Sequence, residues 1–498
     1  MLRALPFGII KEFYVKRLVE PIRWAASTTP FPNVMLMPDL TRPCNLSRLL
    51  CGIVLAALPA AAACQVVPPT PTTLPSPLTL QTAIVIALRQ QPQVYIARDQ
   101  ITQASGQKLQ AQSQYYPTLT PRYQFQRRQQ TFIGVSANTF STPATTNQTT
   151  LVQGGGLAVS LNQNLFDGGA REAANSQARR AVDATDFGSL NTRQATILTV
   201  TQDYYQILLA QDLVKVAQAQ VVRYQQSVEL AQAQIAAGTL AAKNVYQAQS
   251  DLANAQVTLL QNQNQRQLAS AALKNVLGAG TNAPVEPSPL AAGDQLPPLP
   301  AAGPALTLDA ALTAAYAFRP DLRQQQAVVE SQNAALQLAK RQSGLTVRGD
   351  YALTYQATND LGARGTDSQI SLTGSYPLFD AGNVRGAVRI GQAQRDLAQN
   401  QLELIRQQIR QDVESAVGTR ATNLQEAQLA QAAITAAQVN FDAAVAARRE
   451  GIGTVLDITI AQTTLTQSEN QYVTAIYNFY TADAQLQRAL GQNDAGFR

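Results

Sequence analysis

The chain of 498 residues contains no histidine, and its three cysteines, three methionines and single tryptophan all lie at or before Cys64. Without a thiol or an imidazole beyond Cys64, the remainder excludes Cys-His and Ser-His-Asp catalysis, haem with histidine or methionine ligands, and most zinc sites. An enzyme built from this segment would depend on carboxylates, lysine, serine or tyrosine, and no nucleophile paired with a base stands out. We therefore expect neither an enzyme nor a cofactor.

Charged and aromatic residues are also scarce, at 14% and 6% of the chain. Alanine, glutamine, leucine and asparagine dominate the middle, which favours long helices with close packing over a globular catalytic core. Residues 1–64 hold seven basic and three acidic residues, which leaves 31 of the 38 basic and 29 of the 32 acidic residues for the remainder. This near balance, without a basic run, gives no electrostatic reason to expect nucleic-acid binding.

The N-terminal segment has the pattern of a secretory signal peptide. Arg42 and Arg48 precede the apolar run 49–58, which is too short to span a membrane and is followed by small residues at 61–63. We therefore expect the protein to leave the cytoplasm. Cys64 directly follows the small residues. It is either the lipidated first residue of the mature chain, or it has no role and the signal peptide is cleaved nearby in the ordinary way.

The rest of the chain repeats itself. The segment that starts at Leu78 recurs from Leu306, and the motif that starts at Leu165 recurs from Leu378, at a smaller separation. The two copies therefore share one architecture, with a longer loop in the first. The expected organisation is an N-terminal extension and signal peptide (1–64), a Pro-rich lead-in (65–77), a first repeat (78–282), a Pro-rich linker (283–305), a second repeat (306–491) and a tail (492–498).

Long helices are the main feature of each repeat. No proline occurs from Gly169 to Ala237, and apolar residues between Val214 and Ile235 follow spacings of three and four, the period of a coiled coil. The segment 382–450 matches it in the second repeat. Further helices are expected at about 81–115 and 309–342, which open the repeats, and at about 240–277 and 455–490, which return from the long helices. Left-handed caps are expected at Gly238 in the first repeat and at Gly451 with Gly453 in the second.

Between the opening and long helices the apolar period changes from 3.6 to 2. Runs of about ten residues alternate near Leu119–Phe125, Leu157–Leu165, Leu345–Tyr355 and Ile370–Leu378, with a long Thr/Asn-rich loop inside the first pair. This is the length of a transmembrane barrel strand. The alternative is two surface hairpins that cap a helical rod.

Four such strands leave two open edges, which lipid does not tolerate. Closure therefore requires other chains, and three copies would supply twelve strands. The predicted fold is mostly α with a small β part: an internally duplicated, long antiparallel α-helical coiled-coil barrel, continuous with a transmembrane β-barrel that has four strands per protomer and twelve in a homotrimer.

A short motif marks the start of each long helix. It is Phe166-Asp167-Gly168-Gly169 in the first repeat and Phe379-Asp380-Ala381-Gly382 in the second. The aspartates can cap exposed amides, and the glycines permit a sharp turn. This pair of motifs, each followed by a long proline-free segment, resembles the strand-to-helix junction of the TolC-like outer membrane efflux protein family (outer membrane factors). The resemblance spans about residues 78–491.

The resemblance implies a homotrimer whose strands form a pore in the lipid of the outer membrane and whose helices form a periplasmic tunnel. Family members receive substrates from inner-membrane pumps through periplasmic membrane fusion adaptors. The implied function is a passive exit duct of a tripartite export system, for drugs, small toxic compounds or secreted polypeptides. The rival interpretation is a periplasmic coiled-coil adaptor or structural protein without a pore.

The resemblance places control of opening at the periplasmic tip. Asp457 matches the family's first aperture aspartate, where a ring of three would attract cations and raise its members' pKa values. It also completes a capping box with Thr454, so both roles stay open. The second aperture aspartate falls on Ile460, and the family's arginine after the turn glycine is replaced by Gly453. Candidate latch or adaptor contacts are Arg448, Arg449, Glu450, Gly451 and Gly238, although the two arginines also suit a solvated helix end.

Overall fold

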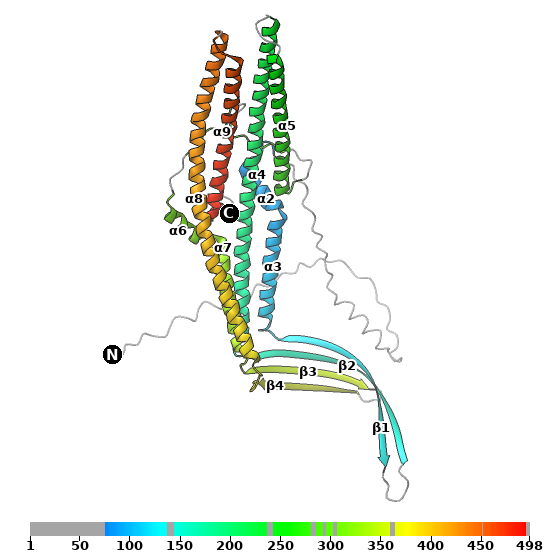
Figure 1. The fold of residues 1–498 in the computed structure, drawn as a ribbon. Coiled ribbons are helices and arrows are strands. Elements are labelled where there is room, and N and C mark those ends of the chain that lie inside the picture. Colours follow the sequence, from blue (N-terminus) through cyan, green and yellow to red (C-terminus); the bar gives the residue numbers. More distant parts are fainter. Residues whose placement is uncertain are drawn as a thin grey trace, which may run out of the picture. The chain divides into compact units, whose positions relative to one another are not determined.

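The computed structural model describes residues 75–136, 144–236, 243–279, 285–291, 295–301, 306–358, 364–450 and 452–494. Within them, the same order of elements occurs twice (Figure 1). The first set is α2 (Leu80–Gln90), α3 (Pro92–Ser113), β1 (Thr118–Ser136), β2 (Ala144–Phe166), α4 (Ala170–Ala236) and α5 (Lys243–Leu277). The second set is α6 (Leu308–Phe318), α7 (Pro320–Arg341), β3 (Thr346–Thr358), β4 (Arg364–Ser375), α8 (Asn383–Arg449) and α9 (Val455–Ala489). The fold is mostly helical with one antiparallel sheet, as predicted; the expected signal peptide, Cys64, Gly238 and Gly451 lie outside the described residues.

The opening helix of each repeat is interrupted at a proline. Gln91 separates α2 from α3, which begins at Pro92; in the second repeat, Arg319 separates α6 from α7, which begins at Pro320. Gln91 and Arg319 have ψ angles of 121° and 124° because a following proline disfavours the helical conformation. The single helices predicted at 81–115 and 309–342 are therefore wrong, since each consists of two.

The long helices α4 and α8 have 67 residues each, which corresponds to about 100 Å. α4 contacts α2, α3, α5, α7 and α9, whereas α8 contacts α6, α7 and α9. The left-handed cap predicted at Gly453 is wrong: this residue lacks a positive φ, and its amide donates to the Ala447 carbonyl at 3.0 Å. None of the described helices has the length and hydropathy that crossing a membrane requires.

The returning helices α5 and α9 end at glycines in the left-handed conformation. Gly278 has a φ of 68° and Gly491 a φ of 73°. Each glycine lies against the proline break of its own repeat: an added Cβ would come within 3.2 Å of Gln90 at Gly278, and within 2.8 Å of the Phe318 backbone at Gly491. The pairs Leu277-Gly278 and Leu490-Gly491 therefore mark the place where a returning helix meets the break in an opening helix.

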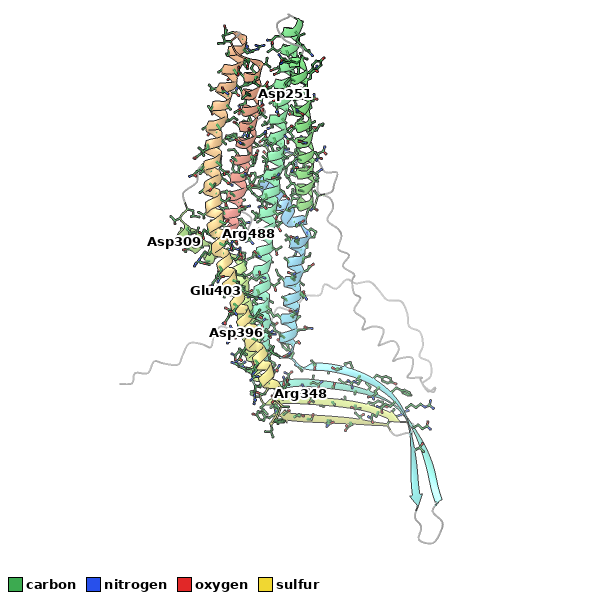
Figure 2. All side chains as sticks on the ribbon, viewed as in Figure 1. Asp251, Asp309, Arg348, Asp396, Glu403 and Arg488 are labelled. Carbon is green, nitrogen blue, oxygen red and sulfur yellow. The ribbon has the colours of Figure 1, made fainter. Side chains whose placement is uncertain are left out.

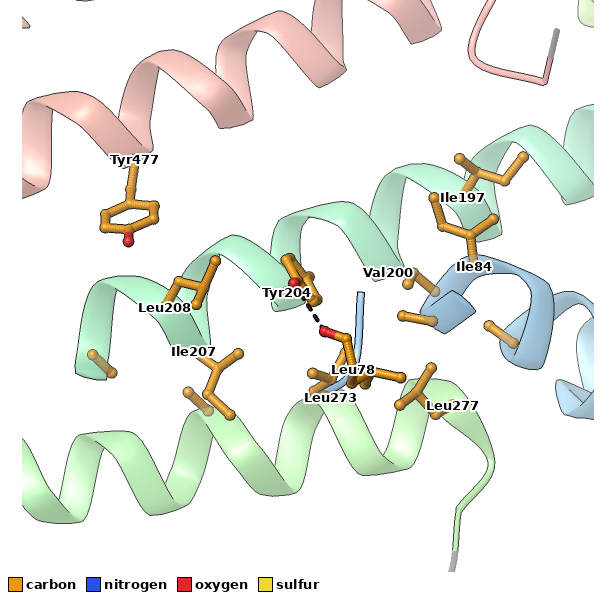
Figure 3. Packing of buried hydrophobic residues seen from close by; sticks show 14 of the residues in the cluster. Leu78, Ile84, Ile197, Val200, Tyr204, Ile207, Leu208, Leu273, Leu277 and Tyr477 are labelled. Atoms are coloured by element: carbon orange, nitrogen blue, oxygen red, sulfur yellow. Dashed lines mark hydrogen bonds between the residues drawn. The ribbon is translucent and has the colours of Figure 1, made fainter. Parts of the chain in front are cut away.

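The largest core cluster surrounds the segment that precedes α2 (Figure 3). Leu78 is fully buried among residues of α2, α4, α5 and α9, and the hydroxyl of Tyr204 in the middle of α4 donates to its carbonyl at 3.0 Å. The Leu78 amide donates to the Glu286 carbonyl, and the Leu78 carbonyl accepts from the Ser288 amide, both at 2.8 Å. The start of the first repeat and the Pro-rich linker are thus held together at the middle of α4.

The linker also contacts the second repeat. Leu296 and Leu299 pack against a cluster that contains Ala427 of α8 and Ile476 of α9. The hydroxyl of Tyr472 donates to a linker carbonyl, that of Pro297, at 2.8 Å. The linker is therefore fixed to the helices of both repeats near their middle.

The four strands form one antiparallel sheet in the order β1-β2-β3-β4. β1 and β2 have 19 and 23 residues, and they remain paired beyond the ends of β3 and β4, which have 13 and 12 (Figure 1). The short strands and the long loop predicted for the first repeat are therefore wrong. Threonine-rich sequence has good strand propensity, and here 126–136 pairs with 144–154 where a loop was expected.

Candidate functional site

The sheet has one apolar face and one polar face. Leu119, Leu161, Tyr351 and Ile370 lie opposite one another in a row across all four strands, and further apolar residues occupy the same face on either side of this row. The reverse face carries the row Arg122, Ala158, Thr354 and Asp367. Leu119 and Ile370 are 66% and 83% exposed. An apolar face this open requires lipid or another protein to cover it.

The first strand-to-helix junction is covered by the second repeat. Asp167 accepts hydrogen bonds from the amides of Gly169 and Arg171, each at 3.1 Å, and forms a 2.9 Å ion pair with the Arg171 side chain. Arg341 at the end of α7 donates to the Gly169 carbonyl at 2.7 Å. Gly168 and Gly169 both have positive φ, which allows the turn from β2 into α4.

The second junction has the same backbone conformation, but among the described residues no side chain of the other repeat covers it. Asp380 accepts from the amides of Val384 at 2.8 Å and Gly382 at 3.0 Å, and these hydrogen bonds hold the pKa of its carboxyl below the ordinary value. Ala381 takes the left-handed conformation, with a φ of 52°, at the place of Gly168. Phe379 is 87% exposed, against 50% for Phe166.

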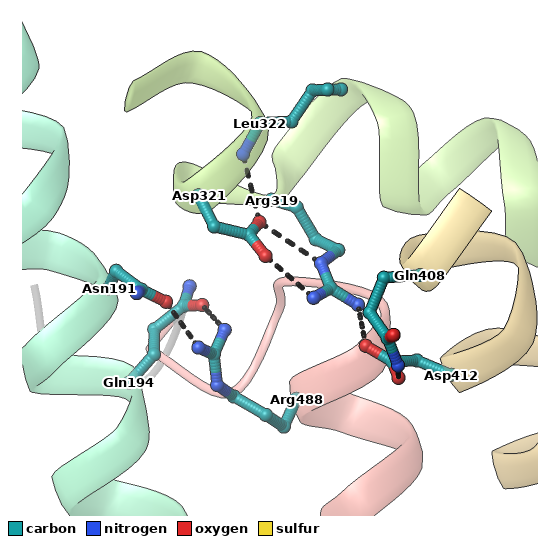
Figure 4. Close-up of polar contacts among 8 residues, drawn as sticks. All are labelled: Asn191, Gln194, Arg319, Asp321, Leu322, Gln408, Asp412 and Arg488. Carbon is teal, nitrogen blue, oxygen red and sulfur yellow. Dashed lines mark hydrogen bonds and ion pairs between the residues drawn. The ribbon is translucent and has the colours of Figure 1, made fainter. Parts of the chain in front are cut away.

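A buried polar network lies where the break between α6 and α7 meets α4, α8 and the end of α9 (Figure 4). Arg319 forms ion pairs with Asp321 at 2.7 Å and Asp412 at 2.9 Å. Arg488 donates to the side chains of Gln194, at 2.7 Å, and Asn191. Sequence patterns do not predict this network, because its members follow no period; the helix break beside Arg319 is the one local signal.

Burial and ion pairing oppose each other in this network. Burial disfavours the charge of Arg319, but its bonds to Asp321 and Asp412 outweigh burial and raise the pKa of the guanidinium. Burial likewise disfavours the charge of Asp321, and the hydrogen bond from Arg319 outweighs it, so that the pKa of the carboxyl is below 3.8. The network therefore holds charges that depend on one another.

At the tip, Arg448 joins α8 to α4. Its guanidinium donates to the Gln234 side chain at 2.7 Å and to the Gly453 carbonyl at 3.2 Å. No sequence pattern predicts Gln234 as the partner of Arg448. Arg449 and Glu450 are exposed.

Asp457 forms the capping box with Thr454. Its carboxylate accepts from the Thr454 hydroxyl at 2.6 Å and amide at 2.8 Å, and the Asp457 amide donates back to the hydroxyl at 3.2 Å. The hydrogen bond from the hydroxyl, followed by that from the amide, lowers the pKa of the carboxyl from 3.8. The carboxylate remains exposed, so capping leaves room for a second role. Ile460, one turn later, is 55% exposed.

α8 carries apolar side chains that remain exposed in the described part of the chain. Leu397, Leu404 and Leu429 are 57%, 63% and 71% exposed. Figure 2 shows Asp396 and Glu403 on the same helix, each directly before one of these leucines. This mixture of leucine and charge is typical of a helix face that meets another helix.

Comparisons with known proteins agree with this geometry. The family model of outer membrane efflux proteins matches residues 83–279 and 311–492, which cover the helices and strands of both repeats. Outer membrane efflux protein BepC of Brucella suis biovar 1 (strain 1330) is 25% identical over 396 residues, which cover 77% of this chain and 79% of BepC. Outer membrane protein TolC of Escherichia coli (strain K12) is 26% identical over 146 residues, 28% of this chain and 30% of TolC.

Solved structures share the fold. The outer membrane protein VceC of Vibrio cholerae superposes with a TM-score of 0.68 at 20% identity, over 83% of this chain and 96% of VceC. The CmeC outer membrane channel of Campylobacter jejuni superposes with a TM-score of 0.70 at 14% identity, over 83% of this chain and 86% of CmeC. With both repeats matched by the family model, the chain belongs to the outer membrane efflux protein family, whose members are channels rather than enzymes.

Proposed function

We propose that the protein is a homotrimeric channel-tunnel of the outer membrane, the passive exit duct of a tripartite export system. The observation that carries this proposal is a mismatch between the repeats. Residues of α4 that are buried against other elements of the same chain have exposed counterparts on α8. We therefore infer that α8 packs against the equivalent elements of a neighbouring copy.

Two antiparallel helices, α4 and α9, define the contact to be repeated. The Tyr477 hydroxyl donates to Asp212 at 2.6 Å, which fixes the register of the pair. Val216, four residues after Asp212, and Val473, four residues before Tyr477, belong to one core cluster and are 4% and 0% exposed. This contact joins the two repeats within one chain.

The equivalent residues of the other repeat have no such contact. In the alignment that places Leu165 on Leu378, Leu429 on α8 corresponds to Val216, and Leu260 on α5 corresponds to Val473. These leucines are 71% and 64% exposed. If α8 of one copy packed on α5 of the next as α4 packs on α9, both would be buried. Full burial of a leucine contributes about 2 kcal/mol, and the contact recurs three times in a trimer.

The strands support the same assembly. β1 and β4 each have one edge without a partner among the described residues. Three copies would join these edges into twelve strands, with the apolar face in contact with outer-membrane lipid and the polar face lining the pore. The six long helices would continue into the periplasm as a tunnel.

At the tip we infer a gate. The bond from Arg448 to Gln234 ties the end of α8 to the end of α4, so its release would let the α8–α9 pair move away from the α4–α5 pair. We propose that Asp457 lines the aperture as well as capping α9. Contacts to an adaptor are proposed for Arg449, Glu450, Gly451 and Gly238.

A periplasmic membrane fusion adaptor and an inner-membrane pump are the proposed partners, because a passive duct needs another source of energy. The proposed cargo is drugs, small toxic compounds or secreted polypeptides. Membership of the efflux family supports this class of cargo.

Planar-bilayer recording of the purified protein tests the proposal. We expect stepwise conductance, and we expect deletion of the gene to increase sensitivity to several unrelated toxic compounds. A purified oligomer that never conducts would contradict the duct and favour a coiled-coil adaptor or structural protein.

A further inference from the structure

The sheet has two edges that lack a partner strand in the described ranges, the outer edges of β1 and β4. Every neighbouring pair in the sheet is antiparallel, so β2 and β4 run in one direction and β1 and β3 in the other. β4 of one copy can therefore pair with β1 of the next in the same sense as β2 pairs with β3.

The β2–β3 ladder is a template for this seam because the repeats correspond position by position. Val159 of β2 lies opposite Leu353 of β3. The alignment of Leu165 with Leu378 places Leu372 of β4 on Val159, and the alignment of Leu78 with Leu306 places Leu353 on Phe125 of β1. Leu372 and Phe125 are therefore the counterparts of two residues that face each other.

We propose that β4 of one copy pairs with β1 of the next in this register, with Leu372 opposite Phe125. The inference rests on the proposed trimer and adds the residue-by-residue contact that joins its copies. Leu372 and Phe125 are 71% and 64% exposed in a single chain. Both belong to the apolar face of the sheet.

An independent observation supports this register, because the apolar segments of the two edges coincide in it. The repeat alignment alone defines the register, yet it brings the apolar residues Tyr123 and Phe125 of β1 opposite Gly374 and Leu372 of β4, and Pro121 opposite Tyr376. A slip of two residues toward the far end of β1 would place Leu372 opposite Arg127 and Ile370 opposite Gln129, so both apolar residues would face polar ones, whereas in the proposed register only Ile370 does. The predicted pairs are Leu372 with Phe125, Gly374 with Tyr123 and Tyr376 with Pro121, because beyond them the template has a bulge at Leu165, the counterpart of Leu378.

Polar residues coincide as well. Past the apolar run, Ser368 faces Gln129, and on the reverse face of the sheet Thr373 faces Gln124 and Ser375 faces Arg122. The reverse face therefore stays polar across the seam, whereas on the apolar face Ile370 meets Arg127. A one-residue slip would exchange the two faces and put apolar residues into the pore.

The register also provides the stagger that a closed barrel requires. The row that starts at Leu119 reaches Ile370 on β4, and Ile370 then meets Arg127 of the next copy. A row of facing residues that starts at Leu119 in one copy therefore arrives at Arg127 in the next copy, further along β1. Strands that advance in this way are tilted against the axis, as in barrels that close.

Disulfide trapping tests the register. We would combine Leu372→Cys with Phe125→Cys, and separately Gly374→Cys with Tyr123→Cys, where an added Cβ at Gly374 meets nothing within 4 Å. The slipped controls combine Leu372→Cys with Tyr123→Cys or with Arg127→Cys. Single-cysteine variants control for the native cysteines, all of which lie at or before Cys64.

Oxidation should link copies into covalent dimers and trimers with both matched pairs, and with about tenfold more product than either slipped pair, because cysteines with Cα atoms more than about 7 Å apart do not bridge. A slipped pair that links better than both matched pairs would overturn the register. So would trimers, seen by native mass spectrometry, in which no pair links. Both outcomes leave the trimeric duct standing, whereas monomers would remove the duct and the seam together.

Discussion

The two long helices have the same length and opposite surroundings. Buried side chains are far more numerous on α4 than on α8, although both helices have 67 residues and equivalent strands and returning helices. The difference arises because α4 lies between elements of both repeats, whereas α8 has the second repeat on one side and no described element on the other. Burial along the first helix therefore indicates what the second is built to contact.

The largest effects are expected from a charge introduced at two equivalent positions of the long helices. Val216→Asp should prevent folding of the protomer, since an unpaired charge in that core costs at least about 3 kcal/mol. Leu429→Asp should leave the protomer helical and abolish the trimer. Circular dichroism and native mass spectrometry separate the two effects. Trimers of Leu429→Asp as stable as the wild type would contradict the equivalence.

A second comparison uses the proline breaks. Arg319→Met should destabilise the protein by about 2 kcal/mol, because Asp321 and Asp412 lose their partner while Asp412 keeps some contact with water. Gln91→Met, at the equivalent break of the first repeat, should change stability by less than about 0.5 kcal/mol. Denaturant unfolding measures both, and equal losses would contradict a special role for the network.

The stability loss caused by Arg319→Met should depend on pH. Arg319 lowers the pKa of the Asp321 carboxyl below 3.8, so the ionised group stabilises the folded state at neutral pH and loses that contribution as pH falls through the lowered pKa. The difference between wild type and Arg319→Met should therefore be widest above about pH 4 and should narrow in more acidic buffer. If the stability difference between wild type and Arg319→Met widened at acidic pH, the stabilising role of ionised Asp321 would be contradicted.

The junction glycines give a smaller contrast. Gly382→Ala should cost about 1 kcal/mol, because the residue is left-handed and its added Cβ meets nothing within 4 Å. Gly169→Ala should cost about 2 kcal/mol, since its Cβ would come within 2.9 Å of the Arg341 guanidinium. Ala381→Gly should stabilise slightly by relieving its positive φ. Thermal unfolding measures all three variants, and equal losses at the two glycines would remove the contrast.

The smallest change in stability is expected at the tips. Asp457→Asn keeps an acceptor for the cap and removes the charge, whereas Asp457→Ala removes both and should cost up to about 1 kcal/mol. If Asp457 lines the aperture, both variants should lose block by trivalent cations in bilayer recordings. Asn244 occupies the equivalent position of the first repeat, so Asn244→Ala should leave block unchanged. Block that persists in both Asp457 variants would leave only the capping role.

Much of the helical architecture could be predicted because its signals are local. The absence of proline after Gly169, together with apolar spacings of three and four, predicted the position and extent of α4 closely. The single opening helices were predicted wrongly, because Pro92 and Pro320 each begin a new helix after a break.

Other features could not be predicted because their signals are non-local. Residues 126–136 and the Thr-rich residues 144–150 resemble a loop, and only their pairing with each other makes them strands. Arg319 and Arg488 lie at unrelated sequence positions, and folding brings them to one site. The bond between Arg448 and Gln234 likewise joins two tips that belong to different repeats.

Native mass spectrometry of the detergent-solubilised protein tests the trimeric assembly, since a protomer with two open sheet edges and an uncovered long helix must be completed by identical copies. We expect one species with three times the mass of the mature chain. A stable monomer that remains monodisperse after detergent is removed would contradict it.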